Sequence, residues 1–209
     1  VGSEMCIRDS YYDAHPDATP DEREISYYYQ QHELSLTTDT GVFSRDKVDF
    51  GSDLLIQTFL NEHPPGQLKR IIDVGCGYGP IGLMVAKVAP HDHITMLDVN
   101  HRALALAKRN AKANGISNVT IQESDGLAMI EDEACDYVLT NPPIRAGKQV
   151  VHQILTDAYR VLKTEGALYV VIQKKQGMPS AKKKMDEVFG NVSSVKNSKG
   201  YHILKSFKS

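Results

Sequence analysis

A glycine-rich turn that leaves an apolar strand and enters a helix constrains the fold of this chain more than any other feature. The strand covers residues 71–74, and Gly75, Gly77 and Gly79 follow it before a helix with apolar positions at helical spacing. Glycine has no Cβ and so lets the backbone turn sharply and approach a ligand closely. The N-terminus of the following helix is electropositive. The pattern favours a ligand site at this turn, and a tight turn without a ligand is the plainer alternative.

Strands and helices alternate from residue 70 onward. The expected strands are short apolar runs, at 71–74, 94–97, 119–122, 137–140 and 168–172. Helices between them repeat apolar residues at i, i+3 and i+4. The chain closes with a helix at 180–189 and two strands, near 192–195 and 201–205. Strands separated by helices require right-handed crossovers, so the sequence predicts an α/β fold with a largely parallel sheet covered on both faces.

Length and composition favour one globular domain. A chain of 209 residues can bury roughly 70% of its unfolded surface, and no apolar run approaches the ~18–20 residues that a bilayer span requires. Cys6, Cys76 and Cys135 form no CxxC pair, which indicates a reducing cytoplasm rather than a disulfide framework or a zinc site. The net charge of −2 gives no overall basic signature of a nucleic-acid binder, so any RNA contact has to come from a local basic patch.

Residues 1–10 differ in character from the rest and resemble translated adapter sequence, so they are left out of the fold. Residues 11–50 are expected to form a lead-in with two short strands, at 25–29 and 34–38. The main domain is expected to cover residues 51–209, and Ser52 is the predicted N-cap of its first helix.

Three aspartates follow three successive predicted strands. Asp73 precedes the glycine turn, Asp98 closes the second strand, and Asp125 comes after the third. At the carboxyl edge of a parallel sheet an acid such as Asp98 can bind a ribose diol, and Asp125 can accept a hydrogen bond from an adenine amino group. Helix capping for Asp98 and a simple turn for Asp125 are the structural alternatives.

Residues 77–82 also match the GxGxxG fingerprint of dinucleotide-binding proteins. Two observations count against that interpretation. The glycine series already starts at Gly75, and Asp73 would bring a carboxylate toward a pyrophosphate. A cofactor that carries a sulfonium and an ammonium group would instead be attracted by the negative charge. S-Adenosylmethionine is therefore the favoured ligand.

The sequence Asn141-Pro142-Pro143-Ile144 follows the fourth strand of the alternation. The side-chain oxygen of Asn141 and the carbonyl oxygen of Pro142 are two acceptors, which can bind both hydrogens of a planar NH2 group. The nitrogen lone pair then turns out of conjugation, and two rigid prolines fix that geometry at little entropic cost. We therefore predict methyl transfer to nitrogen, with Asn141, Pro142 and Pro143 as the catalytic residues. A purely structural turn is the alternative.

Basic residues cluster after the fourth and fifth strands. Arg145, Lys148, Lys174 and Lys175 fall at the same carboxyl edge as the predicted cofactor site. They are expected to flank its mouth and hold phosphates. The lysine run at 182–184 is better explained as a solvated helix face.

From about residue 11 to the end, the chain resembles the class I methyltransferases related to the guanine-N2 methyltransferases of small-subunit ribosomal RNA, in a single-domain form. The stretches that carry the resemblance are 41–45 through 49–52, 73–82, 141–148 and 171–177. The resemblance implies a Rossmann-like seven-stranded, mostly parallel sheet with an antiparallel C-terminal hairpin, and guanine N2 as the target. It also implies contacts to S-adenosylmethionine from Asp73, Gly75, Gly77, Gly79, Asp98, Asp125 and Asn141.

Two departures separate the chain from the two-domain members of that family. We expect it to lack the second, degenerate methyltransferase domain that binds RNA in those enzymes, and Ile144 stands where they tend to have an aromatic residue that stacks on the base. Ile144 is expected to make apolar contact only. A homodimer is one way to enlarge the RNA footprint, although no residue requires it.

Three functions compete on these grounds. RNA N-methylation, in which a guanine flips into the Asn141 pocket, is the leading one. Protein glutamine methylation also presents a planar amide NH2 to such a site, but those enzymes usually carry Tyr after the prolines and an extra N-terminal helical domain. A cofactor-binding RNA assembly factor without catalysis is the third.

Overall fold

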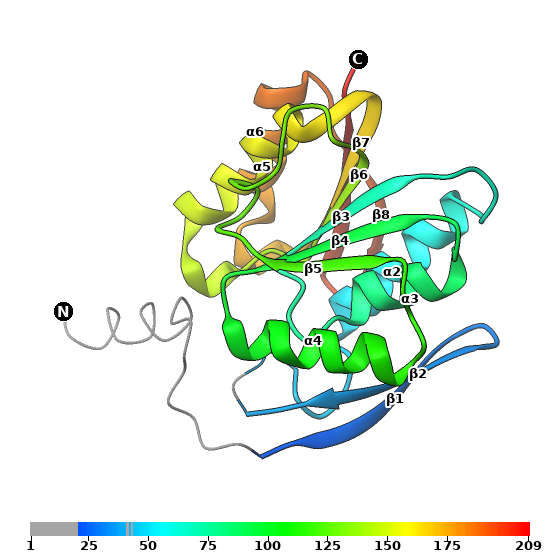
Figure 1. Cartoon of the computed structure of the whole chain (residues 1–209). Helices are drawn as coiled ribbons and strands as arrows, with labels where there is room; N and C mark the ends of the chain where they lie inside the picture. Colours follow the sequence, from blue (N-terminus) through cyan, green and yellow to red (C-terminus); the bar gives the residue numbers. More distant parts are fainter. Residues whose placement is uncertain (1–20, 41, 43) are drawn as a thin grey trace.

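A seven-stranded sheet forms the centre of the protein, in the computed structural model that describes residues 21–40, 42 and 44–209. Its strand order is β5-β4-β3-β6-β7-β9-β8 (Figure 1). The first five strands in that order run parallel, and β9 and β8 are antiparallel additions. The bounds are β3 Arg70–Val74, β4 His93–Asp98, β5 Val119–Glu123, β6 Cys135–Thr140, β7 Leu162–Gln173, β8 Ser193–Ser198 and β9 Tyr201–Phe207. The predicted Rossmann-like α/β fold with a C-terminal hairpin is confirmed.

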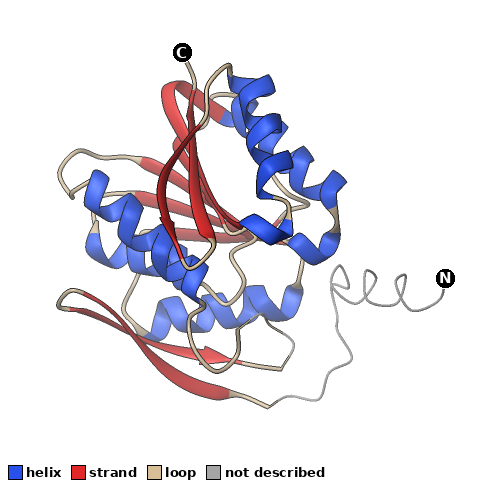
Figure 2. Ribbon diagram, turned by 180° about the vertical axis from the view of Figure 1, so that it is seen from behind, coloured by secondary structure: helices blue, strands red, loops and turns tan. Residues whose placement is uncertain are grey.

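Helices cover both faces of this sheet (Figure 2). Alternate strand residues point to opposite faces, so Ile71 and Met96 pack with one group of helices while Ile72 and Leu97 pack with the other. The first group is α2 Phe50–Glu62, α3 Pro80–Val88 and α4 His101–Ala113. The second is α5 Lys148–Val161 and α6 Met178–Phe189. Two short 3-10 turns, η1 Ile144–Ala146 and η2 Lys174–Gln176, follow β6 and β7.

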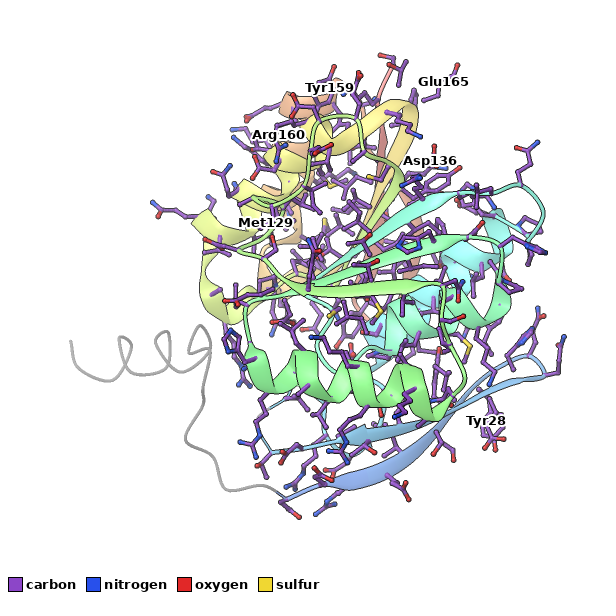
Figure 3. All side chains as sticks on the ribbon, viewed as in Figure 1. Tyr28, Met129, Asp136, Tyr159, Arg160 and Glu165 are labelled. Atoms are coloured by element: carbon purple, nitrogen blue, oxygen red, sulfur yellow. The ribbon has the colours of Figure 1, made fainter. Side chains whose placement is uncertain are left out.

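An antiparallel hairpin, β1 Arg23–Tyr29 and β2 His32–Thr38, lies outside α3 and α4. Leu34 and Leu36 are fully buried and share the hydrophobic core of α2, α3 and α4. On the outer side of the hairpin Tyr28 is exposed (Figure 3). The two predicted N-terminal strands are thus confirmed, whereas the boundary at residues 50 and 51 stays a prediction. The adapter-like segment 1–10 and residues 11–20 lie outside the described residues.

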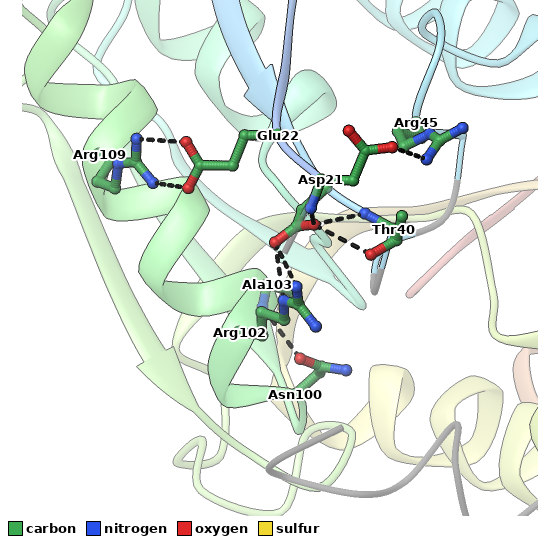
Figure 4. A network of polar contacts seen from close by, with 9 residues as sticks. Asp21, Glu22, Thr40, Arg45, Asn100, Arg102, Ala103 and Arg109 are labelled. Atoms are coloured by element: carbon green, nitrogen blue, oxygen red, sulfur yellow. Dashed lines mark hydrogen bonds and ion pairs between the residues drawn. The ribbon is translucent and has the colours of Figure 1, made fainter. Parts of the chain in front are cut away.

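Asn110 of α4 and Asn114, the C-cap of that helix, bind the edge of β2 in place of a further strand. Asn110 exchanges hydrogen bonds of 2.8 and 3.0 Å with the backbone of Thr37, and Asn114 does the same with Ser35 at 2.9 and 2.8 Å. Ion pairs add to this attachment, because Arg109 of α4 binds Glu22 and Arg102 binds Asp39 (Figure 4). The hairpin is therefore fixed against the helix that follows β4.

Several boundaries differ from the sequence-based expectation. The expected N-cap Ser52 is wrong, because α2 begins at Phe50 and its N-cap is Asp49, whose side chain accepts from the Ser52 amide at 3.1 Å. Asp49 and Ser52 are equally good capping residues, and only packing chooses between them. The fifth parallel strand is also much longer than its apolar run 168–172, because β7 starts directly at the end of α5.

Candidate active site

The glycine turn between β3 and α3 is held against the end of β4. The amides of Gly75 and Cys76 both donate to the Leu97 carbonyl at 2.8 Å. Gly79 has a φ of 107°, and a Cβ there would lie 2.8 Å from Leu83 Cδ1. Only glycine fits that position, since a side chain would be strained both by the backbone angle and by the contact. The glycine turn therefore brings bare backbone, with no side chain over it, to the carboxyl edge of the sheet.

Asp98 connects the glycine turn to the end of β4. Its carboxylate accepts from the Gly77 amide at 2.8 Å and from the Asn100 amide at 3.0 Å. Burial raises the pKa of Asp98 above its ordinary value, while the Asn100 and Gly77 amides act in the opposite direction. Each carboxylate oxygen still has acceptor capacity beyond one amide, and the contact of Asp98 to a ribose diol stays a prediction.

Asp73 lies beneath the turn rather than in it. Its side chain is fully buried on the face that packs against α3, and Oδ2 accepts from the Gly82 amide at 2.9 Å. Oδ1 has no hydrogen-bond partner among the described residues. Burial raises the pKa of Asp73 to about 7, and the nearby Asp98 carboxylate adds to this increase. Asp73 thus holds the start of α3, and its predicted cofactor contact stays a prediction.

A cleft opens beside the turn, between the ends of β4 and β5 and the start of α5. Its lining includes the acidic residues Asp98 and Asp125 and the apolar residues Val99, Pro143 and Ile154. Gly75, Ser124 and Gly126 also line it. Gly75 also faces the Asn-Pro-Pro segment, because a Cβ at Gly75 would lie 4.0 Å from both Asn141 O and Pro143 Cδ. The two sequence motifs, 66 residues apart, therefore meet at one cleft.

The side-chain amide of Asn141 is oriented by residues of α2. Asn141 Nδ2 donates to Asp49 Oδ2 at 3.1 Å and to Ser52 Oγ at 3.0 Å. Both acceptors take the NH2 end of the amide, so the amide oxygen is the end left for another donor. Sequence reasoning missed Asp49 and Ser52 as part of this site. The only signal was their place in the stretch 49–52, which carried the family resemblance.

The two prolines form a compact turn. Pro143 has φ −74° and ψ 80°, close to an inverse γ-turn, and the Ile144 amide donates to the Pro142 carbonyl at 2.9 Å. The Pro142 carbonyl, which the sequence suggested as an acceptor for the substrate, therefore already has one intramolecular partner. A carbonyl oxygen has two lone pairs, so one remains for a second donor.

The predicted basic residues all lie at this edge of the sheet and are exposed. Arg145 is in η1 and Lys148 opens α5, directly after β6, while Lys174 and Lys175 form η2 after β7. Ile144, in contrast, is half-buried in η1. Neither Arg145 nor the three lysines line the cleft itself, which leaves them for a ligand that extends beyond it.

A family model described as "Methyltransferase small domain" matches residues 33–205. The chain belongs to the methyltransferase small domain family. That match includes the glycine turn, the Asn-Pro-Pro segment and most of β2. None of the described helices combines the length and the apolar character that crossing a membrane would need.

The relatives of this chain include a protein of similar length and proteins about twice as long. The chain is 45% identical to the uncharacterized protein YbxB of Bacillus subtilis, over 97% of this chain and 100% of that one. It is 37% identical to ribosomal RNA small subunit methyltransferase C of Hahella chejuensis, over 68% of this chain and 41% of that one. The chain thus spans less than half of that curated rRNA methyltransferase.

A solved structure of similar fold is the T. thermophilus 16S rRNA N2 G1207 methyltransferase in complex with AdoMet and guanosine. The TM-score is 0.81 at 24% identity, and the match covers 94% of this chain and 53% of that one. At this identity the likeness shows the methyltransferase fold.

Proposed function

We propose that this enzyme transfers a methyl group from S-adenosylmethionine to an exocyclic amino group of ribosomal RNA, with guanine N2 as the target. The observation that carries the proposal is the fixed amide of Asn141. Its NH2 end is bound by Asp49 and Ser52, so its oxygen is available to a substrate amino group, and the Asn141 backbone lies beside Gly75 of the cleft. The names of the relatives, which are rRNA methyltransferases, support the choice of RNA.

The residues around the cleft fit S-adenosylmethionine as the cofactor. Asp98 offers carboxylate oxygens to a ribose diol, and Asp125 offers an acceptor to the adenine amino group. Val99, Pro143 and Ile154 offer apolar walls for the adenine ring. The turn of Gly75, Gly77 and Gly79 lets the chain run close to the ligand, and the buried charge of Asp73 favours a cationic one. When bound, this cofactor supplies an electrophilic methyl group.

Asn141 and Pro142 prepare the acceptor nitrogen. The Asn141 amide oxygen and the second lone pair of the Pro142 carbonyl accept the two hydrogens of the amino group. Hydrogen bonding of both hydrogens turns the nitrogen lone pair out of conjugation with the ring, which makes the nitrogen more nucleophilic. A general base is not needed beforehand, because the nitrogen loses its proton only after it has become positively charged. The rigid Pro142-Pro143 turn holds both acceptors in position.

The exposed basic residues serve the RNA backbone in this proposal. Arg145 and Lys148 follow β6, and Lys174 and Lys175 follow β7, so cations flank the site on two sides. Each phosphate that such a residue neutralises releases counterions, which gives affinity without sequence preference. Ile144 contributes apolar contact to the base. The proposal assigns the reaction to the cytoplasm and needs only one protein chain.

The decisive experiment measures transfer of tritiated methyl from S-adenosylmethionine to purified small subunits, large subunits, naked rRNA and release factor. We expect label as N2-methylguanine in one RNA. The Asn141→Ala variant should lose turnover but keep its affinity for RNA. Label in the release factor instead would identify a protein glutamine methyltransferase. Cofactor binding without transfer to any of the four substrates would contradict the proposed reaction.

A further inference from the structure

Two aromatic rings pack together at the start of α2, the helix end whose Asp49 and Ser52 orient the amide of Asn141. Phe50 is the first residue of α2 and follows Asp49, while Tyr201 is the first residue of β9. Their ring centroids are 5.4 Å apart with planes inclined by 50°, and both side chains are only partly buried. Positions 50 and 201 are far apart in sequence, so this pair exists only in the folded chain.

Gly51 shows how close Tyr201 comes to the catalytic amide. A Cβ at Gly51 would lie 2.9 Å from Tyr201 Cε1 and 3.2 Å from Asp49 Oδ2. That same Asp49 oxygen binds Asn141 Nδ2 at 3.1 Å. The Tyr201 ring and the Asn141 amide therefore both lie near the Asp49 carboxylate.

One cation lies over the Phe50 ring, and the turn that carries it is bound to η2. The exposed Lys199, in the turn between β8 and β9, has its Nζ 4.8 Å from the Phe50 ring centroid. The neighbouring Gly200 carbonyl accepts from the Lys174 amide at 2.9 Å, which fixes this turn against η2 with its two lysines. Partly exposed aromatic rings flanked by lysines are the chemistry with which proteins bind unpaired nucleotides.

The hydroxyl of Tyr201 makes no hydrogen bond to the described residues, in contrast to Tyr27 and Tyr29, whose hydroxyls bind Asp53 and Asn61 of α2. Tyr27 and Tyr29 attach the hairpin to that helix, and their rings are buried in the core. Tyr201 is held by its ring alone, at the rim of the site. If the Tyr201 ring served only to pack β9 against α2, its replacement would leave the affinity for substrate unchanged.

We propose that Phe50 and Tyr201 form the stacking wall of the acceptor site, and that Lys199 binds a phosphate next to the stacked nucleotide. The inference rests on the proposed function, because it assumes that an unpaired purine enters the Asn141 pocket. It identifies the planar partner that Ile144, as an aliphatic residue, does not provide. The acceptor is thus a nucleotide in a single-stranded or looped segment, flipped against the rings of α2 and β9.

The test compares Tyr201→Leu with Tyr201→Phe and with Phe207→Leu. Phe207 is the matched control, because it is an exposed aromatic residue at the other end of the same strand. The probe is a short single-stranded RNA with one 2-aminopurine, which carries the same 2-amino group as guanine. Quenching of its fluorescence reports stacking, and its dissociation constant is measured together with that of S-adenosylmethionine.

Loss of one stacking partner corresponds to roughly 5- to 150-fold weaker binding. We expect Tyr201→Leu to weaken RNA binding by at least about tenfold and to reduce the quenching, while cofactor affinity is unchanged. Tyr201→Phe and Phe207→Leu should match the wild type. Lys199→Gln should lower the salt dependence of binding by about one counterion.

The outcomes separate the two proposals. If the wild type binds and methylates RNA but Tyr201→Leu binds the probe as tightly as Phe207→Leu does, the stacking wall is wrong and the proposed function stands. If Tyr201→Leu reduces turnover with unchanged RNA affinity and unchanged quenching, Tyr201 has only a structural role. A wild type that neither binds the probe nor methylates any RNA would overturn both.

Discussion

Replacement of Asp73 by Asn should change the pH dependence of stability in a defined direction. The folded-state pKa of Asp73 is raised to about 7 from an ordinary value of 3.8, chiefly by burial. The folded protein therefore binds more protons than the unfolded chain between these two values. It follows that the free energy of unfolding decreases as the pH rises through this window.

The magnitude follows from the two pKa values. A difference of about 3 pH units corresponds to about 4 kcal/mol when Asp73 is fully ionised. Between about pH 5 and about pH 8, the wild type should lose about 2–3 kcal/mol through this carboxyl alone. Asparagine is isosteric and uncharged, and its oxygen can still accept from the Gly82 amide. The variant should therefore lack that decrease and be the more stable protein at high pH.

Urea unfolding of both proteins at several pH values, without cofactor, measures this difference. The Asp73→Asn variant supplies the background from all other titrating groups, including Asp98, so only the difference between the two slopes is interpreted. Equal slopes would refute the reasoning, because Asp73 would then carry the same charge in the folded and unfolded states. As a second arm, the affinity for S-adenosylmethionine should rise with pH in the wild type more than in the variant, since only ionised Asp73 attracts a cation.

Three further changes test other parts of the site. Ser52→Ala removes one of the two acceptors that orient Asn141. It should lower kcat by about 10- to 100-fold, while cofactor binding measured by calorimetry stays unchanged. An unaffected kcat would exclude an orienting role for Ser52. Gly79→Ala should reduce the free energy of unfolding by about 1–3 kcal/mol in urea titrations, whereas Gly66→Ala, with nothing within 4 Å of its Cβ, should not. Burial raises the pKa of the Cys135 thiol to about 12, so iodoacetamide should label it only after unfolding, and rapid labelling of the native protein would contradict this.

The architecture could be predicted because its signals are local in sequence. Apolar runs of period two and helices of period 3.6 give the order of the elements, and the right-handed crossover rule then leaves few topologies. Residues that follow the parallel strands all lie at the carboxyl edge of the sheet. Asp98 and Asp125 could therefore be assigned to one cleft without any contact information. Both residues do line that cleft.

The acceptor side could not be predicted in the same way. Asn141 is oriented by Asp49 and Ser52, which are 92 and 89 residues away in sequence, and no periodicity connects such positions. Tyr201 reaches the same region only because β9 inserts beside β7, with Gln173 opposite Tyr201. Sequence reasoning also placed the N-cap of α2 three residues too late, since Phe50 and Gly51 do not look like the first turn of a helix.

One atom links the folding of α2 to the chemistry at Asn141. Asp49 Oδ2 accepts both from the Ser52 amide, which caps the helix, and from Asn141 Nδ2, which orients the amide. The Asp49 carboxylate therefore caps the helix and orients the Asn141 side-chain amide from one and the same position. Because Phe50 and the ring of Tyr201 pack around the same turn, a local unfolding of this helix end would remove the amide orientation and the proposed stacking wall together. Under the proposed function, substrate recognition and catalysis would thus depend on one capped turn, whereas the cleft lined by Asp98 and Asp125 would not.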